Sequence, residues 1–226
     1  MQQARSETGI IIQARMTSQR FPGKTTALLD GKPVITRVVE RCLSVPVGKI
    51  IVAIPWEAES QSIIDVLNTS IFEPGFDLFT GAKEDVLDRY YQCATLHKLK
   101  TIVRVTGDCP LIAPKIIIDV LKLYFKNKLD YCSNVYPDRT FAKGLDCEVF
   151  SYDCLEAAWL TAQSTYDREH VTPWMQNEDE VRKGLLKSST NTSAGNLCVD
   201  VPADIKRLED IIVKERRRVF RNRKLN

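Results

Sequence analysis

Two cations follow directly on a strand-like apolar run near the start of the chain. Ile10–Ile12 lead into Gln13, Ala14 and Arg15, and Lys24 ends the segment FPGK. Arginine offers a planar fork of donors to phosphate oxygens and lysine a compact charge, so the pair could receive a phosphate group. The loop lacks the glycine spacing of a Walker or dinucleotide-binding loop, so its backbone is not the main phosphate cradle. On spacing alone, two solvated surface cations explain the pattern equally well.

Two aspartates follow later apolar runs in a similar way. Asp108 lies in VRVTGDCPLI (103–112) and Asp200 in CVDVPADI (198–205), and a proline comes two residues after each. Ligands of open α/β sheets bind beyond the carboxyl ends of the strands, so aspartates at two strand ends could share one hard cation such as Mg2+. The alternative is that each aspartate caps the turn that follows it, which is a common role for this residue.

The elements that must position these residues alternate along the chain. Apolar runs predict strands and helical periods predict helices. In the first half we expect strands at 9–14, 49–55, 76–81 and 101–108 and helices at 33–44, 57–69, 84–97 and 114–127. In the second half we expect strands at 129–134, 145–151 and 196–201 and helices at 152–164, 167–176 and 202–218. This order predicts an α/β fold, with a mostly parallel sheet and helices on both faces. We expect a single domain over 1–226, with a substrate-facing portion at about 130–195.

The composition excludes several classes of function. A net charge of +3 without a long basic stripe argues against a nucleic-acid partner, and the basic run 214–224 is typical of a solvated helix end. No apolar run has the length of a membrane span, and the N-terminal segment lacks the apolar core of a signal peptide. Seven cysteines without a CxxC pair predict reduced, mostly buried thiols and a cytoplasmic location, and the two histidines lack zinc-ligand spacing.

Six motifs together resemble one known family. IIIQARMTSQRFPGK, GAKEDVLDRYYQ, VRVTGDCPLI, GLDCEVFS, DREHVTPW and VDVPADI occur in this order over nearly the whole chain. They resemble cytidylyltransferases of the spore coat polysaccharide biosynthesis protein F type, which are similar to CMP-KDO synthetases and acylneuraminate cytidylyltransferases. The resemblance implies a Rossmann-like nucleotidyltransferase fold, similar to that of the glycosyltransferase A group. It also implies CMP transfer from CTP to a sugar or sugar acid, with Mg2+, pyrophosphate release and a possible homodimer.

The resemblance also implies roles for particular residues. It places the nucleotide and its phosphates at Gln13, Ala14, Arg15, Lys24 and Asp108, and catalysis at Arg15, Lys24 and Asp108. It places the base near Gly81, Ala82 and Asp85, and the metal ion at Asp108 and Asp200. The chain departs from the family pattern at Thr17, at Gln19 and at Lys83, where an acidic residue is typical. The cations and aspartates are kept, so the departures bear on nucleotide preference and loop geometry more than on catalysis.

Acceptor binding is predicted in the second half of the chain. Asp146 and Glu148 would share one face of a strand and bind sugar hydroxyls, with Asn134 nearby. Arg168 could hold an acceptor carboxylate or phosphate in a bidentate fork, and His170 could anchor the acceptor or take a proton. A solvated strand face and a structural histidine are the respective alternatives.

Two rival functions stay open on the sequence. A glycosyltransferase that uses a nucleotide sugar often carries a DxD motif, and DCE at 146–148 is the nearest match here. A non-catalytic nucleotide-binding module would have no reason to keep Arg15, Lys24, Asp108 and Asp200 together. The cytidylyltransferase hypothesis is therefore favoured over both rivals.

Overall fold

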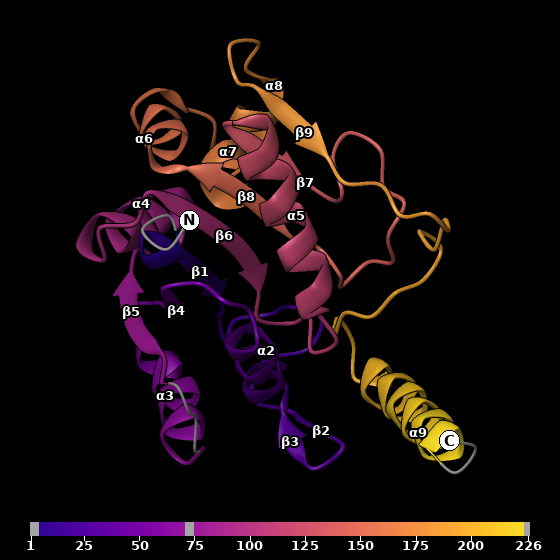
Figure 1. The fold of residues 1–226 in the computed structure, drawn as a ribbon. Coiled ribbons are helices and arrows are strands. Elements are labelled where there is room, and N and C mark those ends of the chain that lie inside the picture. The colour runs from indigo at the N-terminus through magenta and orange to yellow at the C-terminus, as the bar shows by residue number, and fades with distance from the viewer. Residues whose placement is uncertain (1–4, 71–74, 224–226) are drawn as a thin grey trace.

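A seven-stranded sheet forms the centre of the computed structural model, which describes residues 5–70 and 75–223 (Figure 1). The strand order is β5-β4-β1-β6-β8-β7-β9. The neighbouring strands β5, β4, β1 and β6 pair in parallel, whereas β8 runs antiparallel to both β6 and β7. The strands are β1 (Thr8–Gln13), β4 (Lys49–Pro55), β5 (Asp77–Gly81), β6 (Thr101–Thr106), β7 (Tyr131–Ser133), β8 (Glu148–Ser151) and β9 (Lys183–Leu185).

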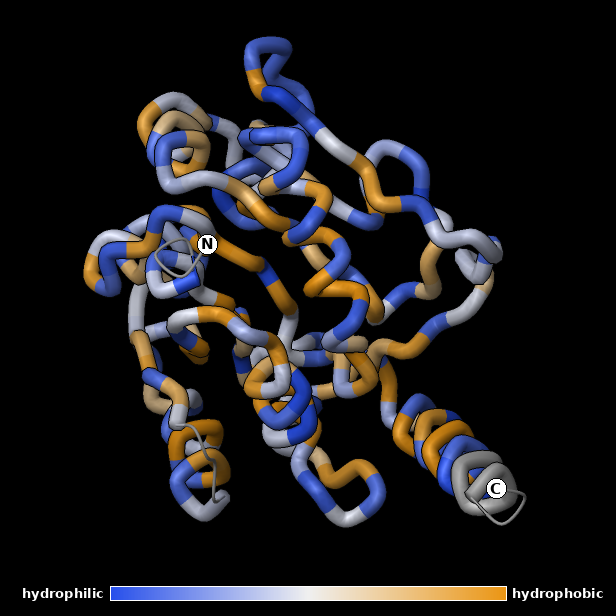
Figure 2. The backbone as a smooth tube through the Cα atoms, in the orientation of Figure 1, coloured by the Kyte–Doolittle hydropathy of each residue, from blue (hydrophilic) through white to orange (hydrophobic). Residues whose placement is uncertain are grey.

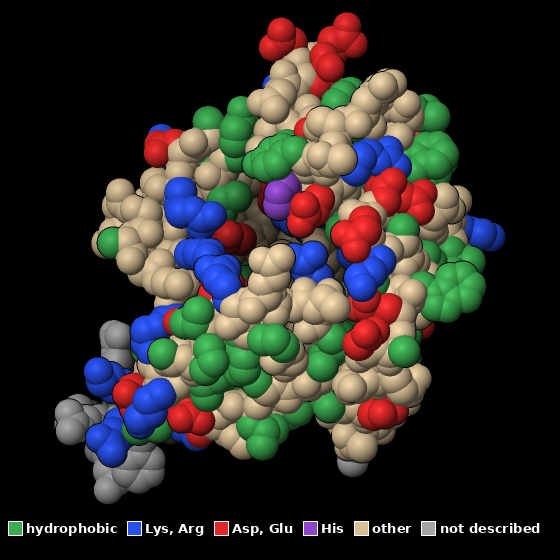
Figure 3. Space-filling model, turned by 180° about the vertical axis from the view of Figure 1, so that it is seen from behind, with side chains coloured by type: hydrophobic (Ala, Val, Ile, Leu, Met, Phe, Trp, Pro, Cys, Tyr) green, Lys and Arg blue, Asp and Glu red, His purple; other side chains and the backbone are tan. Residues whose placement is uncertain are grey.

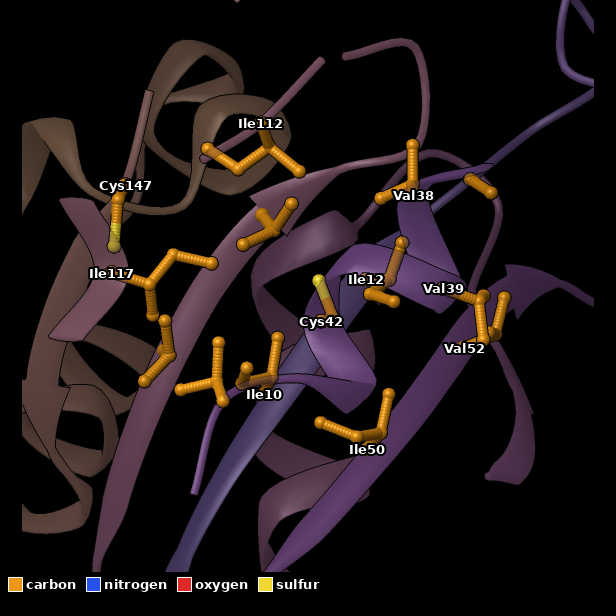
Figure 4. Close-up of a cluster of buried hydrophobic side chains, with 14 of the residues drawn as sticks. Ile10, Ile12, Val38, Val39, Cys42, Ile50, Val52, Ile112, Ile117 and Cys147 are labelled. Carbon is orange, nitrogen blue, oxygen red and sulfur yellow. The ribbon is translucent and has the colours of Figure 1, made fainter. Parts of the chain in front are cut away.

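Helices cover both faces of this sheet because its central strands are apolar on both sides. Ile10 and Ile12 of β1 are buried with one group of helices and Ile11 with the other, as the two-residue period of a strand requires. The first group is α2 (Val34–Leu43), α3 (Gln61–Asn68) and α5 (Pro114–Asn127), and Figure 4 shows part of its core. The second group is α4 (Val86–Leu96), α6 (Tyr152–Thr161) and α8 (Pro173–Asn177), and the exposed helix α7 (Thr165–His170) packs against α4 and α8.

A smaller cluster joins the last helix to a hairpin. The strands β2 (Leu28–Leu29) and β3 (Lys32–Pro33) pair antiparallel and lie against α9 (Ala203–Arg223). Leu208 and Ile212 of α9 are buried with Leu29 and Val34. Figure 2 shows hydrophobic residues along the central strands and alternating with hydrophilic ones along α9. The hairpin was not predicted, because its two strands have only two residues each and are too short to show a periodic pattern.

The predicted fold class is confirmed, and most predicted elements occur within a few residues of their expected bounds. β4 and α5 have the predicted bounds, and α5 begins with Pro114 in its first turn, where no N–H is needed. The predicted helix at 167–176 is instead two short helices, α7 and α8.

One strand prediction near the site was wrong, and another was correct only in part. Residues 196–201 form no strand, because their backbone donors are used elsewhere. Val199 N–H donates to the carbonyl of Asp108, and Asp200 and Val201 N–H donate to the side chain of Asp204. Asp200 therefore lies in a loop before α9. The predicted strand at 145–151 begins only at Glu148, so Asp146 lies outside it.

None of the described helices is both long and apolar enough to span a membrane. All seven cysteines are unpaired and buried, as predicted. Burial raises the pKa of the Cys42 thiol to about 12, which keeps it protonated and unreactive.

Candidate active site

A cleft of about 1130 Å³ opens at the carboxyl ends of β1 and β6. Figure 3 shows a hollow on this side, with Lys and Arg side chains around it. Six predicted residues line the cleft together, namely Gln13, Ala14, Arg15, Lys24, Asp108 and Asp200. The structure thus brings both predicted cations and both predicted metal ligands to one place, from segments up to 187 positions apart.

The loop after β1 folds back on itself, and this return places Lys24 over the strand end. Gly23 adopts a φ of 76°, which a side chain disfavours, and its N–H donates to the carbonyl of Met16 over 3.2 Å. Thr25 Oγ1 donates to the carbonyl of Arg15 over 2.7 Å, which ties the end of the loop to its beginning. The sequence segment FPGK is therefore a turn that positions its own lysine.

Lys24 lies between the two aspartates. Its Nζ is 2.6 Å from Asp108 Oδ2 and 3.3 Å from Asp200 Oδ1, and only 13% of its side chain is exposed. Lys143 Nζ lies 2.7 Å from Asp200 Oδ2, and Arg20 approaches Asp200 Oδ1 to 3.1 Å. Burial raises the pKa of Asp200, but the neighbouring Lys143 and Lys24 outweigh it and hold the pKa below its usual value. Asp200 is therefore an anion at neutral pH.

A divalent cation fits this carboxylate pair. Asp108 and Asp200 each bring one oxygen to the same ammonium nitrogen, so the two oxygens converge on a single positive charge. Mg2+ is usually bound by one or two carboxylates and keeps its other positions for water and substrate phosphate. In the described part of the chain, no group of three or more His, Cys, Asp and Glu side chains could hold a metal ion. The pair thus fits an ion that binds together with a nucleotide.

Arg15 lines the cleft and makes only one long ion pair. Its Nη1 lies 3.9 Å from Glu169 of α7, at the limit of an ion pair, and 47% of its side chain is exposed. An exposed pair of this length contributes little stability, so the guanidinium is available to an anion that enters the cleft. Sequence reasoning did not single out Glu169, because one acidic residue in a helix carries no specific signal.

A buried network supports the cleft behind Gln13. Arg104 of β6 forms an ion pair with Glu148 and donates to Gln13 Oε1 over 3.4 Å. Tyr131 donates to Glu148 Oε1 over 2.5 Å, and Gln176 also reaches this oxygen. Burial, and then the Glu148 charge, raise the pKa of the Tyr131 hydroxyl well above its usual value. Glu148 is thus a buried partner of Arg104 and does not face the solvent.

The other predicted acceptor residues have partners within the protein. Asn134 is fully buried and bridges the backbone of Leu145 and Cys147. Asp146 forms a bidentate pair with Arg139, at 2.6 and 2.9 Å. The strand face that Asp146 was predicted to share with Glu148 is absent, because β8 begins after Asp146.

Arg168 and His170 of α7 also lie outside the cleft lining that the described residues form. Arg168 Nε and Nη2 donate hydrogen bonds to Asp85 Oδ2 over 2.9 and 2.6 Å. Its Nη1 donates to the carbonyl of Trp159. His170 is exposed and packs edge-on against Tyr166. Acceptor binding by these residues stays a prediction.

The segment predicted to lie near the base forms one wall beside the cleft. Gly81 ends β5, and Asp85 caps α4 by accepting the Asp88 N–H over 2.9 Å. Of this segment, Lys83 and Glu84 line the cleft, together with Glu59 and Ser62 from the region before and within α3. The predicted residues Gly81, Ala82 and Asp85 are not part of the lining that the described residues form.

Comparison with known proteins relates the chain to enzymes of one kind. The family model described as cytidylyltransferase matches residues 9–225. A spore coat polysaccharide biosynthesis protein, SpsF of Bacillus subtilis, is 27% identical over 177 residues, which are 74% of this chain and 69% of that protein. A 3-deoxy-manno-octulosonate cytidylyltransferase of Sodalis glossinidius is 34% identical over 115 residues, but these are only 49% of this chain and 43% of that protein.

A solved structure extends the similarity to the fold. The structure of a cytidylyltransferase from Leptospira borgpetersenii superimposes with a TM-score of 0.85 at 28% identity, covering 92% of this chain and 87% of that one. The residues that the family model matches include all the segments that line the cleft. This chain is therefore a member of the cytidylyltransferase family.

Proposed function

We propose that this protein transfers CMP from CTP to a sugar or sugar acid and releases pyrophosphate, as a step in surface polysaccharide or glycan biosynthesis. Family membership and the similarity to SpsF and to a 3-deoxy-manno-octulosonate cytidylyltransferase support this function. The observation that carries the proposal is Lys24, which lies between Asp108 and Asp200 at the floor of a cleft.

The residues of the cleft would act by position and charge. An acceptor hydroxyl attacks the α-phosphorus of CTP, and pyrophosphate leaves with growing negative charge. Arg15 and Lys24 would bind the phosphates and offset that charge, which is the kind of stabilisation that contributes most to such reactions. Gln13 and Ala14 would contact the nucleotide beside them, and Gln13 is held by Arg104.

Asp108 and Asp200 would hold Mg2+ in this proposal. When bound, Mg2+ supplies charge neutralisation at the phosphates. Lys143 contacts the other oxygen of Asp200, and together with Lys24 it keeps this carboxylate anionic at the edge of an open cleft.

Pyrophosphate release tests this function. Wild-type protein with Mg2+, each of the four nucleoside triphosphates and a panel of sugars and sugar acids should release pyrophosphate with CTP and an acceptor together. Asp30→Asn is a matched control, because Asp30 pairs with Arg37 and Arg216 beside the β2–β3 hairpin, away from the cleft. Turnover of a nucleotide sugar with release of a nucleoside diphosphate would instead identify a glycosyltransferase.

A cytoplasmic location is part of the same proposal. It is supported by the need for CTP and by seven unpaired cysteines, which are typical of a reducing compartment. We propose no nucleic-acid or membrane partner. A homodimer stays a prediction, which sedimentation analysis of the purified protein tests.

A further inference from the structure

Lys143 binds the oxygen of Asp200 that Lys24 does not contact. Its Nζ lies 2.7 Å from Asp200 Oδ2, whereas Lys24 and Arg20 approach Asp200 Oδ1 to 3.3 and 3.1 Å. The bond to Lys143 is the shortest of the three, and it restrains rotation of the carboxylate. With Oδ2 held, Asp200 Oδ1 stays directed at the point that it shares with Asp108 Oδ2.

A short bridge between two loops brings Lys143 to this place. Lys143 N–H donates to the carbonyl of Gly195 over 2.9 Å, and Leu197 N–H donates to the carbonyl of Lys143 over 2.6 Å. Lys143 and Asn196 thereby pair in parallel, as residues of two neighbouring strands do. The second loop runs on from Leu197 to Asp200. The lysine and the aspartate are therefore carried by two loops that are tied together beside them.

Gly144 allows the two loops to approach this closely. It adopts a φ of 94°, in the region that side chains disfavour. A Cβ at this position would lie 2.6 Å from the carbonyl carbon of Leu197 and 2.8 Å from the backbone nitrogen of Cys198. Backbone atoms cannot give way as a flexible side chain can. A larger residue at position 144 would therefore separate the loops and move Lys143 away from Asp200.

Asn134 anchors the far end of the loop that carries Lys143. Its fully buried side chain donates to the carbonyl of Leu145 over 2.8 Å and accepts from the N–H of Cys147 over 2.8 Å. The loop is thus fixed on both sides of Gly144. A solvated surface lysine would require neither the bridge nor the glycine, so this construction indicates a role for Lys143 at Asp200.

We propose that Lys143 is a positioning residue for the metal ion, an inference that rests on the proposed function. It acts through Asp200, because holding Oδ2 keeps Oδ1 in the direction in which Asp200 and Asp108 would bind Mg2+. Carboxylates that bind metal ions are generally held by further hydrogen bonds, and loss of such a partner typically lowers metal affinity roughly 10- to 100-fold. Lys143 is not part of the cleft lining that the described residues form, so it does not bind the nucleotide itself.

The charge of Lys143 acts against this effect, since a cation near a metal site repels the metal ion. However, 49% of the Lys143 side chain is exposed, so water and salt screen the repulsion. Orientation of Asp200 should therefore outweigh repulsion. This fixes the sign of the prediction, which is that removal of Lys143 weakens metal binding.

The test is the dissociation constant of CTP, measured by calorimetry once with Mg2+ and once with a chelator. The ratio of the two constants gives the contribution of the metal ion and requires no acceptor. Lys143→Met and Lys143→Gln should reduce this contribution roughly 10-fold, while CTP binding with the chelator stays unchanged. Lys143→Arg should retain most of the contribution, because arginine can still donate to Asp200.

Lys187→Met is the matched control. Lys187 Nζ lies 2.7 Å from Asp138 Oδ2, so it has an ion pair of the same length as that of Lys143, and 59% of its side chain is exposed. It should leave the contribution of the metal ion unchanged. Melting temperatures show which variants are folded, and the two neutral replacements of the half-exposed Lys143 keep the test decisive if one of them does not fold.

The variant Asp200→Asn separates action through Asp200 from action on the nucleotide. In this background Lys143→Met should have no further effect, because the residue through which it acts has lost its charge. An effect as large as that in the wild-type background would show that Lys143 contacts the nucleotide, and would overturn the positioning role.

The same measurements distinguish failure of this inference from failure of the proposed function. If Asp200→Asn reduces the contribution of the metal ion but folded Lys143→Met leaves it unchanged or increases it, the positioning role is wrong and the proposed function stands. If Asp200→Asn itself changes nothing, the metal site and the role of Lys143 both fail. Wild-type protein that binds no CTP would overturn the proposed function as well.

Discussion

Replacing Asp200 by asparagine separates a structural role of this residue from a catalytic one. In the structure its carboxylate meets Lys24, Lys143 and Arg20 at 3.3, 2.7 and 3.1 Å. Asparagine keeps an acceptor oxygen but removes the charge. The contact to Arg20 is largely exposed and contributes little, so the contacts to Lys143 and Lys24 should account for most of the loss. We expect the free energy of unfolding to fall by about 1 kcal/mol, which is a decrease in Tm of roughly 2–4 °C.

The effect on turnover should be much larger than the effect on stability. If Asp200 holds Mg2+ with Asp108, loss of its charge leaves phosphate charge unneutralised in the transition state. Loss of one such contact costs roughly 2.7–4 kcal/mol, or a ~100- to 1000-fold decrease in kcat. The Mg2+ concentration that gives half-maximal rate should rise in the same variant.

The assay is pyrophosphate release over a Mg2+ titration for Asp200→Asn and Asp108→Asn, with urea unfolding alongside. Asp30→Asn should keep the wild-type rate and Mg2+ dependence. If Asp200→Asn also keeps both while its stability falls by about 1 kcal/mol, Asp200 only braces the loop before α9. That result would remove the metal site from the proposed function.

Three further outcomes are expected. Burial raises the pKa of Asp204, but the Arg207 side chain and the N–H groups of Asp200 and Val201 outweigh it and hold the pKa below its usual 3.8. The charged carboxylate therefore stabilises the fold above the pKa of the unfolded state, and this stabilisation is lost as pH falls through the pKa of the folded state. Asp204→Asn should lower the free energy of unfolding, measured in urea, at about pH 7 and change it little at about pH 2. Arg168→Met should lower the free energy of unfolding by roughly 1.5–3 kcal/mol, because all three of its bonds hold Asp85 and Trp159; a higher KM for the acceptor at unchanged stability would restore the predicted acceptor role. The seven buried thiols should react with a thiol reagent only on unfolding, and fast labelling of native protein would contradict their burial.

The parallel half of the fold could be predicted because its signals are local. Ile10–Ile12 and residues 49–55 are uninterrupted apolar runs, and Pro114 marks a helix start. The second half is less regular because its short strands depend on partners far along the chain. β8 pairs antiparallel with β6 and β7, and no local pattern specifies that arrangement.

The phosphate end of the site was predictable, whereas the acceptor side was not. Arg15, Lys24 and Asp108 follow strand ends, and the carboxyl ends of parallel strands meet at one edge. Glu148 has the sequence signature of a surface carboxylate, but its burial depends on Arg104, which lies 44 positions away. Arg89 was not singled out either, since only the structure shows that its guanidinium is buried and finds no hydrogen-bond partner among the described residues.

A crystal structure of the wild-type protein with CTP and Mg2+ tests most directly whether Lys24, Asp108 and Asp200 form the centre of a cytidylyltransferase site. We expect the metal ion on oxygens of both aspartates and the triphosphate against Arg15 and Lys24, with the base beside Gly81. A nucleotide bound elsewhere, for example in the hollow near Trp174 and Arg182 at the opposite edge of the sheet, would contradict the assignment. So would a bound CTP whose metal ion touches neither Asp108 nor Asp200.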